Sequence, residues 1–201
     1  MQRFFKAHFL VITASILFLS ACTSLPTQEY QPIEVTHVKD ADNWELQGKI
    51  AFKSSTDKFS TNLYWFHHLN GNELRLTTPL GTNVLTLKND QGLATLEVDG
   101  KAYHDNNPQA LLEGVSGITI PFADIPLWLT GQIGSKDNVI SYNSSGQVLQ
   151  FNSPDDEADW QVSFVSWQQQ SGVLVPKQLK IVRKDVQIKI QTNLWQALTP
   201  K

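Results

Sequence analysis

The fold is decided by the stretch Trp44-Glu-Leu-Gln-Gly-Lys-Ile-Ala-Phe52, in which apolar and polar residues alternate. Successive side chains of a β-strand point to opposite faces of a sheet, so this period of two predicts a strand with one apolar face. The residues expected on that face are Trp44, Leu46, Ile50 and Phe52. The next stretch has the same period, and we expect Phe59, Leu63 and Trp65 to share a face of a second strand.

Similar stretches predict further strands at 74–76, 84–87, 93–98, 102–103, 139–142, 148–151, 160–164, 179–181 and 186–190. Asp99-Gly100 separates two of them, and this dipeptide is typical of a two-residue hairpin turn. The sequence therefore predicts a mainly β, single-domain protein with about ten or eleven antiparallel strands.

Two short helices interrupt this pattern. Asn107 is a typical N-cap, Pro108 suits the first helical position, and Gly114 suits the end of a first helix. Residues 123–131 predict a second helix that ends at Gly131. Two apolar helices within a long sheet indicate a lid, so we expect the sheet to curl and the helices to cover one opening. The many aromatic side chains either fill the enclosed space or leave an apolar cavity.

One turn carries an unusual residue. Residues 77–83, Thr-Thr-Pro-Leu-Gly-Thr-Asn, contain the Pro and Gly of a turn between two strands, but Leu80 is at the centre. Turns lie on the surface, where a polar residue carries no cost. Leu80 therefore folds back onto the core, stays in water without consequence, or has a role at the surface.

The composition limits the classes of function. The chain has 201 residues, a charged fraction of 17% and a formal net charge of −3. This length suffices for one domain with a sizeable core, and this charge provides no basic field for nucleic acid. Residues 1–21 contain Arg3 and Lys6 followed by an uncharged apolar run too short to span a membrane, and we interpret them as an export signal that is removed.

Cys22 is the only cysteine, so it cannot form an internal disulfide. Leu19-Ser-Ala-Cys22 resembles the bacterial lipobox, in which the cysteine receives a diacylglycerol and becomes the mature N-terminus. The alternative is a buried free cysteine after an ordinary cleavage site. An Asp directly after the acylated cysteine resembles the signal that retains a lipoprotein in the inner membrane, but Thr23 follows Cys22 here. We therefore expect a lipid anchor in the outer membrane, on the periplasmic face.

The remaining chain divides into two parts. We interpret residues 22–43 as an acylated N-terminus and tether, which could hold the domain away from the membrane when extended. Residues 44–201 form the predicted folded domain.

No catalytic or metal-binding motif is visible. His67-His68 is expected in a solvated loop and lacks zinc-ligand spacing, and the acidic residues 155–157 are expected in a solvated turn. The chain has no Gly-x-Ser-x-Gly elbow, no phosphate-binding glycine loop and no dinucleotide motif. We therefore expect no metal, no cofactor and no enzyme, although distant residues can assemble a catalytic site.

Several stretches together resemble the LolB family of outer-membrane lipoprotein receptors. They are the lipobox, residues 44–52, Leu63-Tyr-Trp65, Leu74-Arg-Leu-Thr-Thr-Pro-Leu-Gly81, Asn107-Pro-Gln-Ala-Leu-Leu112, Leu127-Trp-Leu-Thr-Gly131, Trp160-Gln-Val162 and Val175-Pro-Lys-Gln-Leu179. Each is weak alone, but their order is specific, and the resemblance extends over about 44–195.

The resemblance implies an unclosed antiparallel β-barrel whose helical lid encloses an apolar cavity for acyl chains. It implies that a monomer accepts lipoproteins from the soluble periplasmic carrier LolA and inserts them into outer-membrane lipid. The turn Pro79-Leu80-Gly81 resembles the protruding loop that the family uses for delivery. The residues expected in the cavity or lid are Trp44, Phe59, Leu63, Trp65 and Trp128.

Two other classes stay open. One is a structural or interaction lipoprotein of the outer membrane, with a packed core in place of a cavity. The other is an envelope hydrolase, for which the sequence offers no polar cleft residue. A bound acyl chain distinguishes the receptor from both.

Overall fold

A computed structural model describes residues 28–201, which form parts of two compact units. The larger unit is Tyr30–Thr199. In the smaller unit, the backbone nitrogen of Lys201 donates to the carbonyl oxygen of Glu29 at 3.0 Å, and Lys201 Nζ lies 2.9 Å from Glu29 Oε2. The predicted signal sequence and Cys22 lie outside the described residues.

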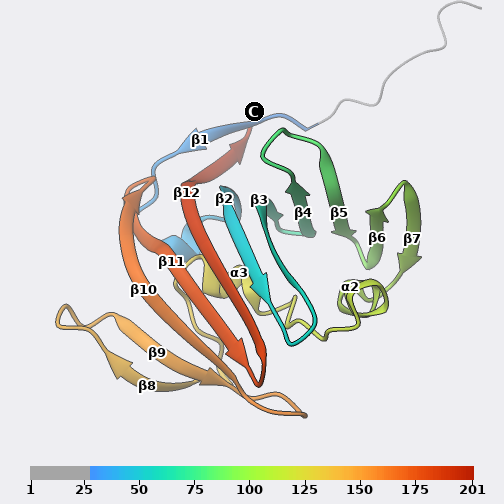
Figure 1. The fold of residues 1–201 in the computed structure, drawn as a ribbon. Helices are drawn as coiled ribbons and strands as arrows, with labels where there is room; N and C mark the ends of the chain where they lie inside the picture. The colour runs from blue at the N-terminus through green and yellow to red at the C-terminus, as the bar shows by residue number, and fades with distance from the viewer. Residues whose placement is uncertain (1–27) are drawn as a thin grey trace, which may run out of the picture. The chain divides into compact units, whose positions relative to one another are not determined.

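The larger unit contains twelve strands in one sheet (Figure 1). They are β1 (Tyr30–Ile33), β2 (Asn43–Lys53), β3 (Lys58–His68), β4 (Gly71–Thr77), β5 (Asn83–Asp90), β6 (Leu93–Val98), β7 (Lys101–Asp105), β8 (Asn138–Tyr142), β9 (Val148–Ser153), β10 (Trp160–Gln170), β11 (Val173–Arg183) and β12 (Val186–Pro200). The order is β7-β6-β5-β4-β3-β2-β12-β11-β10-β9-β8, and β1 pairs with β12.

The sheet is antiparallel and does not close, since β7 and β8 are its two ends. This confirms the expected unclosed barrel. The number of strands is twelve because residues 30–33, which we assigned to the tether, form β1. Pro32 conceals this strand in the sequence, and a proline is tolerated there because β1 pairs with a single neighbour. The 3₁₀ helix η1 (Val38–Asp40) follows, so the larger unit begins at Tyr30 and not at residue 44.

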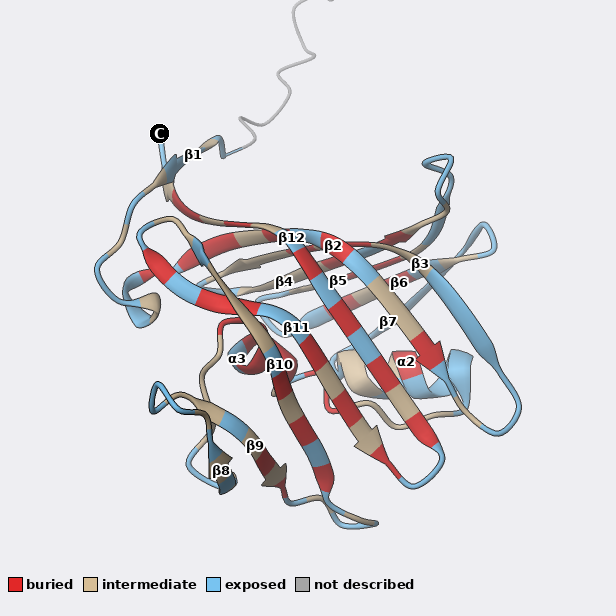
Figure 2. Ribbon diagram, turned by 60° about the vertical axis from the view of Figure 1, so that its left-hand side comes forward, coloured by how far each residue is buried: buried red, intermediate tan, exposed pale blue. Residues whose placement is uncertain are grey.

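The alternation in β2 sets the inner face of the sheet. Trp44, Leu46, Gly48, Ile50 and Phe52 face inward, whereas the residues that alternate with them face outward. Gly48 is required on this face because a Cβ there would collide with the backbone carbonyl of Gln191 in β12. Figure 2 shows buried residues alternating with more exposed ones along β10, β11 and β12 as well. The period of two therefore predicts which side of each strand faces the core.

Turn and cap residues account for the connections. Asp99 and Gly100 both have positive φ, of 52° and 72°, as the predicted hairpin between β6 and β7 requires. Helix α2 (Pro108–Ser116) begins after Asn107, whose side chain accepts from the backbone nitrogens of Gln109 and Ala110.

The predicted end of this helix at Gly114 is wrong. Helix α2 continues to Ser116 and stops at Gly117, whose φ of 68° is left-handed and whose N–H bonds to the carbonyl of Glu113. Gly114 lies inside the helix, because one glycine weakens a helix without ending it. Helix α3 (Ile125–Leu129) is followed by Gly131 at φ 79°, as expected.

The two helices and the chain between them lie within the curve of the sheet (Figure 1). The core fills the space between the sheet and this segment, with Leu112, Phe122 and Trp128 among its buried members. Among residues 28–201, no helix is long and apolar enough to span a bilayer.

Candidate functional site

An apolar cavity of about 120 Å³ lies between the sheet and the segment that covers it. Its walls come from β2, β3, β4, β5 and β12, from α2, from the chain between α2 and α3, and from Ile125 at the start of α3. The lining residues are Ile50, Phe52, Phe59, Leu63, Trp65, Leu74, Leu76, Leu85, Leu112, Val115, Ser116, Ile120, Phe122, Ile125, Ile188 and Ile190. Ser116 alone carries a polar side chain, so the cavity suits hydrocarbon and offers little to a polar ligand.

The sheet wall follows from strand register. Leu63 of β3 is paired with Leu76 of β4, and the next inward residue, Trp65, is paired with Leu74. Ile50 of β2 is paired with Ile190 of β12. Because cross-strand partners face the same side of a sheet, the register places a continuous apolar surface on the inner face.

The cover is apolar on the side that meets this wall. Leu112 and Val115 are three residues apart in α2 and therefore share one helix face. Ile120 and Phe122 follow in the connecting segment. The Phe122 ring stacks on the Trp65 ring, with centroids 5.1 Å apart and planes at 24°. Such a pair contributes about 0.5–1.5 kcal/mol beyond its buried area, so this contact alone does not fix the cover.

Arg183 attaches the cover to the sheet by polar contacts. It ends β11 with a side chain that is 6% exposed, and Nη1 lies 2.9 Å from Asp155 Oδ1. Nη2 donates to the carbonyl oxygen of Thr119 at 3.0 Å, and the guanidinium lies 4.3 Å from the Trp160 ring centroid. A buried charge needs partners of this kind. Thr119 precedes Ile120 of the cavity lining, so the hydrogen bond from Arg183 to the Thr119 carbonyl supports the cover directly.

Phe59, Leu63 and Trp65 line the cavity, whereas Trp44 and Trp128 do not. Phe59 is 46% exposed and stacks on Phe52 with centroids 5.2 Å apart, so it lies at the rim. Trp44 therefore lies outside this cavity, and Trp128 lies in α3, one of the two helices expected to form the lid.

Both tryptophans pack in solid parts of the core. Trp44 stacks on His67 at 5.2 Å between centroids, and Trp128 meets Phe151 edge-on at 5.8 Å. The cavity lies against β2–β5 and β12, whereas α3 and large aromatic residues fill the space beside β9 and β10. Alternation predicts the inner face of a strand and not how far a cavity extends along the sheet.

The β4–β5 turn holds Leu80 in solvent, with 95% of its surface exposed. The turn is closed by hydrogen bonds from the Thr78 nitrogen to the Thr82 carbonyl (2.8 Å) and from the Gly81 nitrogen to the Thr78 carbonyl (2.9 Å). Gly81 has φ 87°, a conformation that favours glycine. In Figures 1 and 2, this turn and β1 lie at the same upper end of the larger unit.

Two titratable residues near the core, His67 and Asp155, have structural partners. His67 lies in β3 and not in a solvated loop, with Nδ1 2.9 Å from Asn72 Oδ1, and burial lowers the pKa of its imidazole. Asp155 pairs with Arg183, so the expectation of a fully solvated acidic turn is wrong for this residue. Among residues 28–201, no three His, Cys, Asp or Glu side chains are grouped to hold a metal.

Arg183 is not among the residues predicted from the sequence. Its signal is visible in the strand pattern, because the residue occupies an inward position after Leu179 and Ile181. A single charged residue on the apolar face of a strand indicates a buried ion pair.

Comparisons with known proteins show the family of this chain. Residues 42–195 match the family described as "Outer membrane lipoprotein LolB". The outer-membrane lipoprotein LolB of Shewanella frigidimarina is 58% identical over 194 residues, covering 96% of this chain and 95% of that protein. LolB of Shewanella denitrificans is 58% identical over 189 residues, covering 94% and 92%. A solved LolA superfamily protein from Nitrosomonas europaea has 6% identity and a TM-score of 0.48, covering 78% of this chain and 86% of that protein.

Proposed function

This chain belongs to the LolB family of outer membrane lipoproteins, and on that premise we propose that it receives lipoproteins from the soluble periplasmic carrier LolA and inserts them into the outer membrane. Membership of this family makes it a trafficking protein and not an enzyme. Three parts of the chain would share this work. A cavity holds the acyl chains, an anchor holds the domain at the membrane, and a turn enters lipid.

The observation that carries the proposal is the covered apolar cavity. Its wall joins five strands and its cover is a separate segment with a single polar side chain in the lining, Ser116. Each CH₂ group moved from water into such a space contributes about 0.8 kcal/mol. A path between two such cavities therefore transfers acyl chains without nucleotide hydrolysis.

The cover must move to admit a ligand. A volume of about 120 Å³ is well below the roughly 300–1,000 Å³ of ordinary ligand pockets. The walls on the sheet are fixed by backbone pairing, whereas the cover contacts them through side chains such as Phe122 and through Arg183. We therefore assign the opening movement to α2 and the residues between α2 and α3.

The anchor is the acylated Cys22. Because β1 begins at Tyr30, the tether is shorter than the sequence suggested. Residues 22–29 span about 26 Å when extended at about 3.3 Å per residue. This reach keeps the domain beside the periplasmic face of the membrane. Insertion of the acyl chains carried by Cys22 confines the domain to the outer membrane.

The delivering element is Leu80. A fully exposed leucine contributes about 1.5–3 kcal/mol when it leaves water for hydrocarbon. This is too little to anchor the domain, but it orients the upper end of the larger unit, where the turn and β1 both lie (Figure 1), towards the bilayer.

One observation favours a second candidate, a structural lipoprotein with a packed core. The half of the domain beside β9 and β10 is solid, with Phe151, Phe164 and Trp160 buried. Such a protein would bind no acyl chain, so ligand binding separates the two candidates.

The test is titration of the mature chain, residues 22–201 with Cys22→Ala, with a fluorescent acylated peptide. We expect saturable binding of about one peptide per chain, at least tenfold weaker in Val115→Glu, because Val115 lines the cavity. Val165→Glu is the matched control, since Val165 is a similarly exposed valine outside the cavity lining. Absence of saturable binding, or equal effects of both substitutions, would favour the packed-core candidate.

A further inference from the structure

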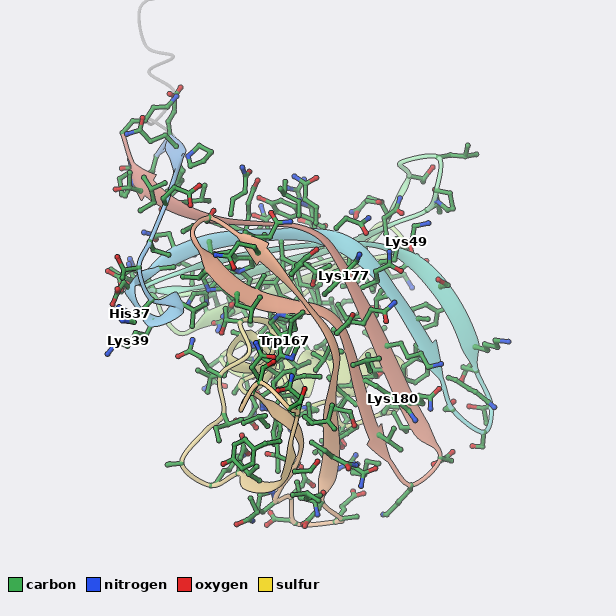
Figure 3. The ribbon with its side chains drawn as sticks, turned by 90° about the vertical axis from the view of Figure 1, so that its left-hand side faces the viewer. His37, Lys39, Lys49, Trp167, Lys177 and Lys180 are labelled. Atoms are coloured by element: carbon green, nitrogen blue, oxygen red, sulfur yellow. The ribbon has the colours of Figure 1, made fainter. Side chains whose placement is uncertain are left out.

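Six lysines gather on the outer face of four neighbouring strands, and we call this set the lysine face. Its members are Lys49 and Lys53 of β2, Lys58 of β3, Lys177 and Lys180 of β11, and Lys189 of β12. Five are exposed and Lys180 is partly buried. Figure 3 shows Lys49, Lys177 and Lys180 on the side of the sheet turned towards the viewer.

Strand register brings these charges together. Lys180 is the direct cross-strand partner of Lys189, and Lys53 is the direct partner of Lys58. Like charges in directly opposed positions destabilise a sheet. The two Lys–Lys pairs therefore lower the stability of the sheet, so packing of the fold does not explain them.

The lysine face has no internal counter-charge. None of its six members forms an ion pair within residues 28–201, whereas every other Lys or Arg described does so, except Lys39 and Lys101. Three acids in or next to these strands accept hydrogen bonds from other groups. Glu45 accepts from Tyr64, Asp57 accepts from Thr56, and Asp185 accepts from the Ser55 backbone. Because no ion pair within residues 28–201 engages the six lysines, their charges can pair with an external anion.

The lysine face is also hollowed. One depression of about 500 Å³ is lined by Lys49, Lys180 and Lys189 with Gln178 and Gln191. An adjoining depression of about 430 Å³ is lined by Lys53, Lys58 and Lys189, and both include Ala51 and Ser60. Lysines around a neutral, partly apolar floor suit a phosphate-bearing headgroup with an attached polar or glyceryl portion.

We propose that the lysine face binds the anionic phospholipid headgroups of a bilayer. An acidic protein is the less favoured occupant, because protein interfaces are enriched in Arg and depleted in Lys. All six cations here are Lys, and both arginines of the described chain, Arg75 and Arg183, are paired elsewhere. Lysine is a compact point charge that suits a diffuse anionic surface. The inference rests on the proposed function only for the nearness of the membrane.

The test is co-sedimentation with phosphatidylcholine vesicles, with and without phosphatidylglycerol, using residues 22–201 with Cys22→Ala so that no acyl anchor contributes. The variant is Lys49→Gln, Lys180→Gln and Lys189→Gln combined. We expect binding only to the anionic vesicles, weakened about fivefold for each lysine removed and about a hundredfold for the triple variant. The matched control combines Lys39→Gln, Lys101→Gln and Lys201→Gln, which removes the same charge elsewhere and should leave binding within a few-fold.

Three results would overturn the proposal: equal binding to both vesicle types, unchanged binding of the triple variant, or an equal loss in the control, which would make the effect one of net charge. Denaturation curves establish that both triple variants fold. Lipoprotein transfer from the carrier, measured without vesicles, should be unchanged in the triple variant. If the triple variant fails in this transfer while its vesicle binding is unchanged, the lysine face binds an acidic protein and not lipid. If the chain without lysine substitutions binds no acylated peptide, the proposed function is refuted, whereas the result of the vesicle test still stands.

Discussion

Replacing Leu80 by Glu should block delivery to lipid without weakening the fold. Leu80 is 95% exposed and contributes no side chain to the core, so we expect the free energy of unfolding to change by less than about 0.5 kcal/mol. The cavity does not include Leu80, so uptake of a lipoprotein from the carrier should be unchanged. Loss of about 1.5–3 kcal/mol of insertion energy corresponds to a roughly tenfold to hundredfold slower delivery, and the charge adds to this loss.

The assay follows transfer from carrier to receptor and from receptor to liposome separately. Leu69→Glu is the control, because Leu69 is a 74% exposed leucine in the preceding turn, at the other end of β4. It should receive and deliver normally. Unfolding of Leu80→Glu would mean that the side chain packs in the core, and normal delivery would mean that the turn has no role in the membrane. Equal defects in both variants would refute a specific role for this turn.

Three further predictions concern the interior. Trp44→Ala should lower the free energy of unfolding by about 3–5 kcal/mol and leave acyl binding by the folded fraction unchanged. Phe59→Ala, at the half-exposed rim, should lower the free energy of unfolding by less and should weaken acyl binding. The reverse pattern in urea denaturation and peptide titration would contradict the cavity boundary. Arg183→Met should lower the free energy of unfolding by about 3 kcal/mol, because Asp155 loses its ion pair and the Thr119 carbonyl of the cover loses its hydrogen bond. The variant should also take up a hydrophobic dye faster. Unchanged denaturation and uptake would show that Arg183 does not hold the cover. Burial lowers the pKa of His67 below its ordinary 6.5, so the unfolded chain binds this proton more tightly than the folded chain. The contribution of His67 to the free energy of unfolding should therefore be fully present above about pH 6.5 and should decrease as the pH falls below it. His67→Gln should reduce this pH dependence of the free energy of unfolding in denaturation curves, and an unchanged dependence would assign it to other groups.

The strand pattern could be predicted from the sequence because the sheet has one buried face. In β2, each inward position must be apolar, and Gly48 interrupts the pattern only where β12 approaches too closely for a side chain. The hairpin at Asp99-Gly100 was equally predictable, since few residues adopt two successive positive φ values.

Other features depend on tertiary contacts that local sequence does not encode. The end of α2 at Gly117 and not at Gly114 is decided by which glycine adopts the left-handed cap. Trp128 has the position of a lid residue, but neighbouring aromatic residues bury it away from the cavity. The exposure of Leu80 excludes one of the alternatives that the sequence left open, because the turn directs its side chain into solvent and not onto the core.

The central claim is that an acyl chain occupies the space between the sheet and its cover. The most direct measurement is photo-crosslinking with an acylated peptide whose fatty acid carries a photoreactive group, bound to the mature chain with Cys22→Ala and mapped by mass spectrometry. We predict attachment to residues on both walls of the cavity, Leu63 on the sheet and Leu112 and Phe122 on the cover. Attachment confined to the outer face of the sheet, for example at Val165, would contradict this claim.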